Sequence, residues 1–469
     1  MATRPQSSGR QERQAQRRHA APRKRFALLR LVIGGFRPRR PAPQVGSSPA
    51  LPQASTRRQL GSIAGLASLA GIALSVFLAT GLDPIGVRLH VGLNPLHRAA
   101  AETGPPAKDL PPTTLINRNP VTPGTIVPPD GLPSDQRRLV RVKTIWGDIA
   151  PKSIVNNGAG LFFAQNMMYR HSITVYDRSF RLVATISDAV RLADFGLAGP
   201  DYTLLGAPVE AAATSDGSKM YVSNYEMEGP GYRNPGNDNC GNGGWDNSFV
   251  YRIDVGKLAI DQVIAVGAVP KYLAITPDDR TLLVANWCSY DLSVIDVATG
   301  VERRRIDLGP YPRGIAIDAR RNVAYVAVMG SADIAVLDLA TFNVSWIYGV
   351  GPAPRHVVLD PSGDFLYVTL NQAGQVAKID LARRQVLNSA YTGEAPRSMA
   401  IAADGASLYV CNYSSNTVSK VSTATMTVLQ TVDVIDQPIG ITYDEAARSV
   451  WVSIYSGAIQ VFEDRSPQR

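Results

Sequence analysis

The stretch "PKYLAITPDDRTLLVANWCSYDLSVIDVATGVERRRIDLG" (residues 270–309) decides the fold of this 469-residue chain. It contains four short apolar runs rich in β-branched residues, and turn signals such as "PDD" and "ATG" separate the runs. Short runs between turn residues are typical of strands rather than helices. The stretch therefore predicts one unit of four antiparallel strands.

The same pattern recurs along the chain, and its opening proline marks each repeat. The aligned prolines are Pro151, Pro208, Pro270, Pro312, Pro354, Pro396 and Pro438. The last four steps are each 42 residues long, whereas the first two are 57 and 62. The longer steps predict insertions at 188–207 and at about 226–247. Four-stranded units at this period are typical of the blades of a β-propeller.

The last unit lacks a fourth strand, because only a charged tail follows "AIQVFED" (458–464). The missing strand is available at the other end of the repeat region. The segment "LVRVKTIWG" (139–147) leads into Pro151 as "VERRRIDLG" (301–309) leads into Pro312. We expect this N-terminal strand to complete blade seven and to close the ring, which removes an open sheet edge.

Four stretches resemble the signature of the YVTN-repeat propellers, a group related to the lactonase-like propellers. They are "LLVANWCSYDLSVIDVATG" (282–300), "VAYVAVMGSADIAVLDLAT" (323–341), "LYVTLNQAGQVAKIDLA" (366–382) and "LYVCNYSSNTVSKVSTAT" (408–425). The resemblance covers roughly residues 137–465 and implies an all-β, seven-bladed propeller. It implies little about function, because propellers of this kind serve unrelated functions.

The charge of the chain is concentrated before the propeller. Residues 1–58 carry a net charge of +13, and the rest of the chain carries −4. The basicity thus lies in a tail, 1–59, that we expect to be disordered and cytoplasmic or a long signal n-region. We do not expect double-stranded nucleic acid as a partner. Residues 83–136 contain eleven prolines and are expected to form an extended linker or stalk.

Residues 60–82 carry no charge and are long enough to cross a bilayer, so they predict a membrane anchor or signal segment. The preceding "STRRQLG" (55–61) resembles a twin-arginine export signal. A plain signal anchor whose arginines set the topology explains the same residues. "ATG" (79–81) offers a cleavage site. Both interpretations place the propeller outside the cytoplasm, either held at the membrane or secreted.

The residue after each aligned proline is a cation in five of the seven units. These residues are Lys152, Lys271, Arg313, Arg355 and Arg397. In a propeller they open the strands that line the central channel. The loops between second and third strands reach the same face and carry Asn224, Tyr225, Asn286, Trp287, Asn412, Tyr413 and Tyr455. Both insertions fall on this face as well.

This convergence predicts a rim that binds an anionic ligand or an envelope protein, without catalysis. The alternative is that Arg313 and Arg355 pair with Asp291 and Asp333 and hold neighbouring blades together. The sequence leaves both interpretations open.

Two enzymatic functions remain as alternatives. In a lactonase-type hydrolase, His356 would act as general base beside Arg355 at the channel mouth, although a lone histidine there is also explained as a structural residue. A subunit of a periplasmic-type redox complex would need a partner that carries the cofactor. We predict no cofactor of the chain itself.

The insertion "NPGNDNCGNGGWDNS" (234–248) carries the remaining candidates. Cys240 and Cys288 fall on the same face and are predicted to form a disulfide in an oxidising compartment. Cys411 is expected to be a buried thiol. Asp238 and Asp246 are weak calcium candidates, because their spacing does not match a known calcium loop. We therefore predict no metal site.

Overall fold

The computed structural model describes residues 114–115, 131–167, 170–233, 240–242 and 244–467. The predicted tail 1–59 and the predicted membrane segment 60–82 lie outside these residues. Within the described part of the chain, no helix combines the length and the apolar character needed to cross a membrane.

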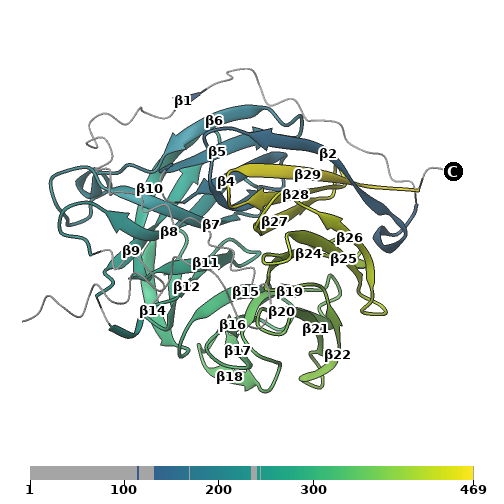
Figure 1. Ribbon diagram of the computed structural model, residues 1–469. Coiled ribbons are helices and arrows are strands. Elements are labelled where there is room, and N and C mark those ends of the chain that lie inside the picture. The colour runs from purple at the N-terminus through teal and green to yellow at the C-terminus, as the bar shows by residue number, and fades with distance from the viewer. Residues whose placement is uncertain (1–113, 116–130, 168–169, 234–239, 243, 468–469) are drawn as a thin grey trace, which may run out of the picture. The chain divides into compact units, whose positions relative to one another are not determined.

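The described residues form seven sheets arranged as blades around one axis (Figure 1). The innermost strand of each sheet contacts the innermost strand of the next, and the last contacts the first. The order of these strands is β3, β7, β11, β15, β19, β23 and β27. This arrangement confirms the predicted all-β, seven-bladed propeller.

Each blade consists of four antiparallel strands, and their bounds follow the predicted repeats. Blade one contains β3 (Pro151–Asn156), β4 (Leu161–Asn166), β5 (Ser172–Asp177) and β6 (Leu182–Ser187), and blade two contains β7 (Leu205–Ala213), β8 (Lys219–Glu228), β9 (Asn247–Asp254) and β10 (Ala259–Ala268). Blade three contains β11 (Pro270–Ile275), β12 (Thr281–Asn286), β13 (Asp291–Asp296) and β14 (Val301–Asp307), and blade four contains β15 (Pro312–Asp318), β16 (Val323–Val328), β17 (Asp333–Asp338) and β18 (Val344–Ile347). Blade five contains β19 (Pro354–Leu359), β20 (Phe365–Leu370), β21 (Gln375–Asp380) and β22 (Gln385–Tyr391), and blade six contains β23 (Pro396–Ile401), β24 (Ser407–Asn412), β25 (Thr417–Ser422) and β26 (Val428–Asp433). Blade seven contains β27 (Pro438–Asp444), β28 (Ser449–Ile454), β29 (Ala458–Arg465) and β2 (Arg138–Trp146).

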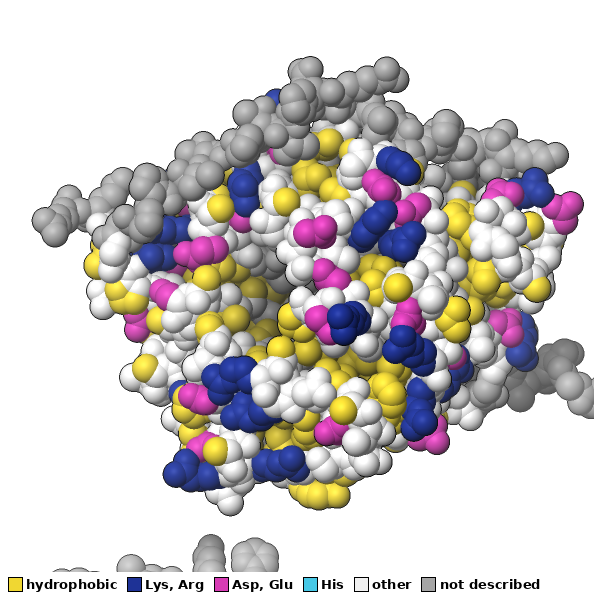
Figure 2. All heavy atoms as spheres, turned by 180° about the vertical axis from the view of Figure 1, so that it is seen from behind, with side chains coloured by type: hydrophobic (Ala, Val, Ile, Leu, Met, Phe, Trp, Pro, Cys, Tyr) yellow, Lys and Arg dark blue, Asp and Glu magenta, His cyan; other side chains and the backbone are white. Residues whose placement is uncertain are grey.

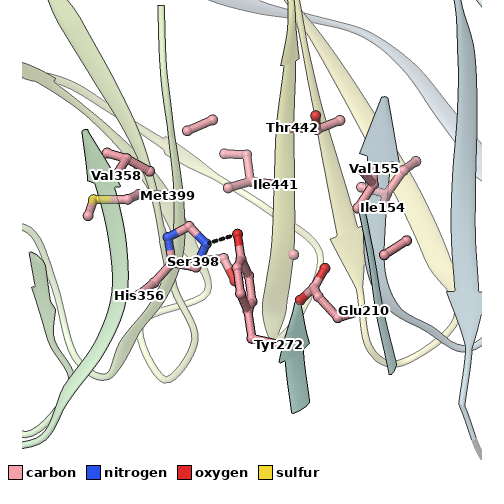
Figure 3. A pocket seen from close by; sticks show the side chains of 13 residues that line it. Ile154, Val155, Glu210, Tyr272, His356, Val358, Ser398, Met399, Ile441 and Thr442 are labelled. Carbon is pink, nitrogen blue, oxygen red and sulfur yellow. Dashed lines mark hydrogen bonds between the residues drawn. The ribbon is translucent and has the colours of Figure 1, made fainter. Parts of the chain in front are cut away.

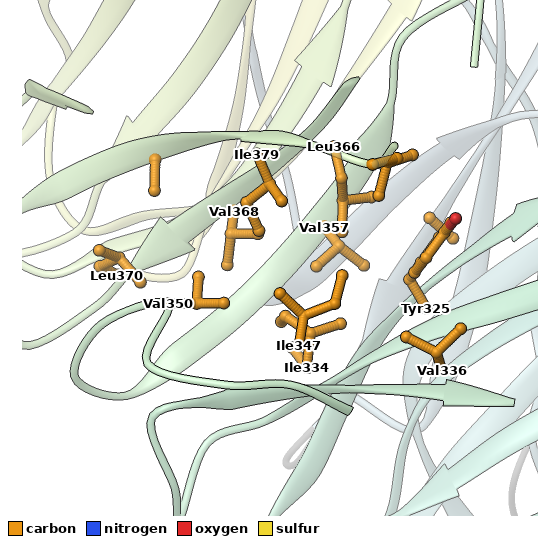
Figure 4. Close-up of a cluster of buried hydrophobic side chains, with 14 residues drawn as sticks. Tyr325, Ile334, Val336, Ile347, Val350, Val357, Leu366, Val368, Leu370 and Ile379 are labelled. Carbon is orange, nitrogen blue, oxygen red and sulfur yellow. The ribbon is translucent and has the colours of Figure 1, made fainter. Parts of the chain in front are cut away.

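The apolar runs of the sequence become the middle strands of the blades, which are covered on both faces. Figure 4 shows such a core between blades four and five, where Ile334 and Val336 of β17 pack with Val357, Leu366 and Val368. The outer strands are different: most of β22 is exposed. Removing a buried leucine such as Leu366 would cost about 2–5 kcal/mol, so the blade-to-blade layers supply the cohesion of the ring.

The ring is closed by the N-terminal strand, as predicted. β2 pairs antiparallel with β29, from Arg138 opposite Arg465 to Trp146 opposite Ala458. Beside this junction lies a buried group that we call the clasp: Lys420, Asp464 and Tyr409. The Lys420 ammonium pairs with the Asp464 carboxylate, which also accepts a 2.8 Å hydrogen bond from the Tyr409 hydroxyl. The clasp joins blade six to the closing blade.

Parts of the predicted linker contact the propeller. The 3₁₀ turn η2 (Ser134–Gln136) precedes β2, and the Ser134 amide and hydroxyl each donate to the Asp404 carboxylate at 2.6 Å. The short strand β1 (Thr114–Leu115) pairs with β6 as a fifth strand of blade one. Two further 3₁₀ turns, η3 (Leu192–Phe195) and η4 (Cys240–Asn242), lie in the two insertions.

Candidate functional site

Every inner strand has an irregularity directly after its opening proline. In blade three, Pro270 lies opposite Asn286 and Tyr272 lies opposite Ala285, so Lys271 is one extra residue on its strand. The other six blades show the same shift of one residue. A β-bulge of this kind re-aims a side chain at the end of a strand. The bulge therefore sets the direction of the residue that follows each proline.

The residue before the proline is strained in several blades. Five such residues have positive φ angles between 23° and 66°: Val269, Tyr311, Ala353, Ala395 and Gln437. This conformation is costly for residues other than glycine, above all for a β-branched one. It turns the carbonyl of Val269 toward the Trp287 amide, and that of Ala395 toward the Tyr413 amide. These hydrogen bonds hold the backbone of Trp287 and of Tyr413 at the ends of their strands.

The five predicted cations lie together at this mouth, and we call them the cation ring: Lys152, Lys271, Arg313, Arg355 and Arg397. Four of them meet the faces of aromatic side chains. The ring-centroid distances are 5.0 Å for Lys152–Tyr455, 4.2 Å for Lys271–Tyr225, 5.2 Å for Lys271–Trp287, 5.5 Å for Arg313–Trp287 and 3.4 Å for Arg397–Tyr413. The fifth cation, Arg355, contacts the Met329 sulfur at 3.7 Å. The structure therefore brings together the predicted cations and the predicted aromatic residues.

Three of these contacts join neighbouring blades, because the aromatic residue of one blade covers the cation of the next. Tyr225 of blade two meets Lys271, Trp287 of blade three meets Arg313, and Tyr455 of blade seven meets Lys152. A cation on an aromatic face keeps its charge. The stacked face of a guanidinium is also separate from its hydrogen-bonding edge. Stacking thus orients the cations without neutralising them.

The cations lie close enough to influence one another. Burial lowers the pKa of Lys152 well below its usual range, and the positive charges of Lys271, Arg313, Arg397 and Arg355 lower it further. On the face of the molecule that Figure 2 shows, basic and acidic side chains lie intermixed. The cation ring is a concentration of like charge at the channel axis.

The two aspartates of the alternative interpretation have partners in or next to their own blades. Asp291 lies 3.7 Å from the Arg305 guanidinium of β14 and accepts a 2.7 Å hydrogen bond from Asn286. Asp333 accepts a 2.8 Å hydrogen bond from the amide of Gly349, beyond β18. These contacts stabilise the ends of single blades.

The three asparagines assigned to the rim from sequence lie inside the blades instead. Asn224, Asn286 and Asn412 are strand residues with fully buried side chains. Their amide nitrogens donate to buried acceptors, for example from Asn224 to the Phe249 carbonyl of the same blade at 3.2 Å. An asparagine at a strand end satisfies buried polar groups of the following turn. We therefore assign these residues to the support of the rim.

A cavity of about 210 Å³ lies in the channel, and sequence reasoning missed most of its lining. Its polar residues are Glu210, Tyr272, His356, Ser398 and Thr442, and apolar residues such as Ile154, Met399 and Ile441 complete it (Figure 3). The first four stand two residues after an aligned proline. In all seven blades this position is polar or small: Ser153, Glu210, Tyr272, Gly314, His356, Ser398 and Gly440. That column was a signal in the sequence for the cavity.

The glycines of this column allow the inner strands to approach each other. A Cβ atom on Gly314 would stand 2.8 Å from the His356 Cα atom, and one on Gly440 would stand 2.6 Å from the Ser153 Cα atom. Contacts this short are not tolerated against backbone atoms. A side chain at either position would push neighbouring blades apart.

His356 and Tyr272 interact across the cavity. The His356 Nε2 atom lies 3.2 Å from the Tyr272 hydroxyl oxygen, and the two rings meet edge to face (Figure 3). The Nδ1 atom of His356 is buried and has no hydrogen-bond partner within the described residues. Burial, with the charges of Arg313 and Arg355, lowers the pKa of His356 to about 3. His356 is therefore neutral at ordinary pH, and this pKa makes it a weak general base.

Glu210 is the acidic side chain of the cavity. Burial raises the pKa of its carboxyl to about 7, although the Ser153 hydrogen bond and the charges of Arg313 and Lys152 oppose this shift. Burial also raises the pKa of Tyr272, together with the nearby charge of Glu210. A group that changes protonation near neutral pH inside a channel is a candidate for function.

Both insertions are attached to the same end of the propeller. A disulfide joins Cys240, in the blade-two insertion, to Cys288, and their Cα atoms are 5.1 Å apart. Cys411 is a buried free thiol. In the other insertion region, His171 lies 3.4 Å from the Asp188 carboxylate and 2.9 Å from the Gly206 carbonyl. These contacts hold the insertions beside the rim.

Of the two calcium candidates, the structure describes only Asp246. Asp238 lies outside the described residues, and Asp246 accepts a 2.7 Å hydrogen bond from the Arg233 amide. Among the residues that the structure describes, no group of three or more His, Cys, Asp or Glu side chains is placed to hold a metal ion.

The comparisons with known proteins concern the fold. A family model described as a YNCE-like beta-propeller matches residues 250–421. With the seven-bladed ring, this match is consistent with a YVTN-repeat-like propeller family. No curated protein matches the chain. Among solved structures, hydrazine synthase of Kuenenia stuttgartiensis is similar with a TM-score of 0.52 and 19% identity, over 68% of this chain and 96% of that chain. At this identity the similarity shows the fold alone.

Proposed function

We propose that the protein is a binding module that holds an anionic ligand at its cation ring. The observation that carries this proposal is the convergence of five cations from five blades on the channel axis, four of which act on Lys152. Like charges held together cost free energy, and a bound anion offsets that cost. The stacked aromatic residues keep the cations in place whether or not an anion is present.

If the protein is a hydrolase, the structure favours Glu210 as its general base, whereas the sequence indicated His356. A general base works best when its pKa lies near the working pH. Glu210, with a pKa of about 7, meets this condition better than His356, with a pKa of about 3. If the channel performs hydrolysis, Glu210 is its candidate base.

We further propose that the propeller is exported and that residues 60–82 serve as its anchor or signal. The disulfide between Cys240 and Cys288 supports this location, because such bonds persist in oxidising compartments. Protease added to intact cells should then degrade the propeller of an anchored protein, or the propeller should appear in the medium. Full protection inside the cell would contradict the proposal.

The proposed binding is tested by calorimetric titration of the full chain with inorganic phosphate. Arg397→Gln and Arg313→Gln should each weaken binding about tenfold, equal to about 1.4 kcal/mol. The matched control is Arg280→Gln, because Arg280 is exposed in the turn after β11, away from the cation ring. Equal phosphate affinity in all three variants would contradict the proposal.

The same preparations are incubated with a panel of small lactones. Turnover that disappears in Glu210→Gln would replace the binding function with hydrolysis.

A further inference from the structure

The cavity is lined in part by residues that directly follow the cation ring along the inner strands. Lys271 and Arg355 are followed in the chain by Tyr272 and His356, which line the cavity. The charges of Arg313 and Arg355 reach His356, and those of Arg313 and Lys152 reach Glu210. A ligand whose anion lies at the ring would therefore have its other end next to the cavity.

The size of the cavity limits the ligand. A volume of about 210 Å³ is far above the roughly 10–15 Å³ that admits one water molecule. It is also below the roughly 300 Å³ at which pockets for drug-sized ligands begin. A dry cavity of about 150 Å³ already holds benzene, so this cavity has room for a small carbon body of about that size.

The lining of the cavity has two kinds of surface. Ile154, Met399 and Ile441 provide apolar contact for carbon atoms. The polar groups include the Glu210 carboxyl, the Tyr272 hydroxyl and the His356 imidazole, whose Nε2 atom lies 3.2 Å from the Tyr272 hydroxyl oxygen. The Ser398 hydroxyl already donates to the Ile439 carbonyl at 2.7 Å, so it offers an acceptor. Buried polar atoms of this kind favour a ligand that can form hydrogen bonds with them.

A hydroxyl group suits this set of atoms best. It can donate to an ionised Glu210 or accept from a protonated one, and it can donate to the Ser398 hydroxyl oxygen. A second anionic group on the ligand would be repelled by the Glu210 carboxylate, and a purely apolar body would offer that carboxyl no hydrogen bond.

We propose that the cavity receives the hydroxylated carbon body of a small anion whose phosphate or carboxylate lies at the cation ring. This inference rests on the proposed function and specifies the class of its ligand. The shared chemistry is one anionic group, a carbon body small enough for the cavity, and at least one hydroxyl group.

The test compares three probes on the full chain by calorimetric titration: inorganic phosphate, propyl phosphate and glycerol 3-phosphate. Phosphate reports the ring alone, propyl phosphate adds the carbon body, and glycerol 3-phosphate adds the hydroxyl groups. We expect each step to tighten binding, to a total of about tenfold or more. Carboxylate probes, propionate and glycerate, then decide between the two anionic groups.

Two variants separate the parts of the site. Ala400→Leu fills the cavity from its lining and should bring all three affinities to the value for phosphate. Glu210→Leu should remove the preference for glycerol 3-phosphate over propyl phosphate while phosphate still binds. If Ala400→Leu lowers the thermal stability, the test rests on Glu210→Leu. The deciding quantity is then the ratio of its affinities for glycerol 3-phosphate and propyl phosphate.

The outcomes distinguish this inference from the function beneath it. Equal affinity of the wild-type protein for the three probes would overturn the cavity proposal and leave the ring proposal intact. If neither variant changes the affinities of propyl phosphate and glycerol 3-phosphate relative to phosphate, the cavity proposal is likewise overturned. No binding of phosphate by the wild-type protein would instead overturn the proposed function.

Discussion

The clasp and the cation ring both hold ionisable groups inside the propeller, and they treat charge in opposite ways. In the clasp, the buried Lys420 ammonium meets the buried Asp464 carboxylate, and burial still lowers the pKa of Lys420 although the carboxylate opposes this. In the ring, the charges of four cations act on Lys152 and lower its pKa in addition to the effect of burial. The clasp pairs opposite charges, whereas the ring gathers five basic side chains, two of which act on the nearby Glu210 carboxyl.

We therefore treat the clasp as a stabilising site and the cation ring as the proposed binding site. Breaking a buried ion pair is strongly destabilising, because the remaining charge has no compensation. Removing one of several like charges loses the contacts of that side chain but also relieves repulsion. These two effects on stability oppose each other. Substitutions in the two sites should therefore affect different measurements: stability in the clasp and anion binding in the ring.

The largest expected effect is the loss of the clasp. Asp464→Ala leaves Lys420 buried without its carboxylate and should lower the free energy of unfolding by about 3–5 kcal/mol. Chemical denaturation measures this change. Asp433→Ala, at an exposed aspartate of β26, should cost less than about 0.5 kcal/mol. Similar losses in both variants would remove the distinction between the clasp and the surface.

An intermediate effect is expected for Glu210, and it depends on pH. The pKa of Glu210 is raised from 4.5 to about 7 in the folded protein, so the folded state binds more protons between these values. The stability of the wild-type protein should therefore fall relative to Glu210→Gln as pH rises from about 4.5 to 7, and the difference should then level off.

Denaturation of both proteins across this range measures the difference. His171 and Asp188 have raised pKa values of about 9 and 6, so they also make stability depend on pH. Both proteins contain these residues, and their contributions cancel in the difference between the two stabilities. A difference that does not vary with pH would mean that Glu210 titrates as an ordinary carboxyl.

The smallest effect on stability is expected in the ring. Arg397→Gln removes the contact with Tyr413 but also relieves repulsion with Lys152, so stability should change by less than about 1 kcal/mol. The matched substitution is Arg178→Gln, because Arg178 forms a buried 2.7 Å ion pair with Asp444. That variant should cost about 3–5 kcal/mol. An equal cost for Arg397→Gln would make the ring a structural feature like the clasp.

Much of the fold could be predicted, because each blade is a local unit of about forty residues. Its four apolar runs and turns specify four strands without reference to the rest of the chain, and the order of the units specifies the ring. The closing strand was predicted for the same reason: the last unit lacked a strand that 139–147 could supply. The outcome for residues 60–82 stays a prediction, because the segment lies outside the described residues.

The site was predicted only in part, and the reason is geometric. The sequence determined the blades, the end at which the cations gather and the aromatic residues near them, because the repeat fixes positions within a blade. The tertiary structure decided that Trp287 stacks on Arg313 of the next blade, that Asn286 is buried, and that Glu210 and His356 share one cavity. These relations arise between blades, where the bulges and the closed ring set the distances, and the order of residues along the chain does not contain them.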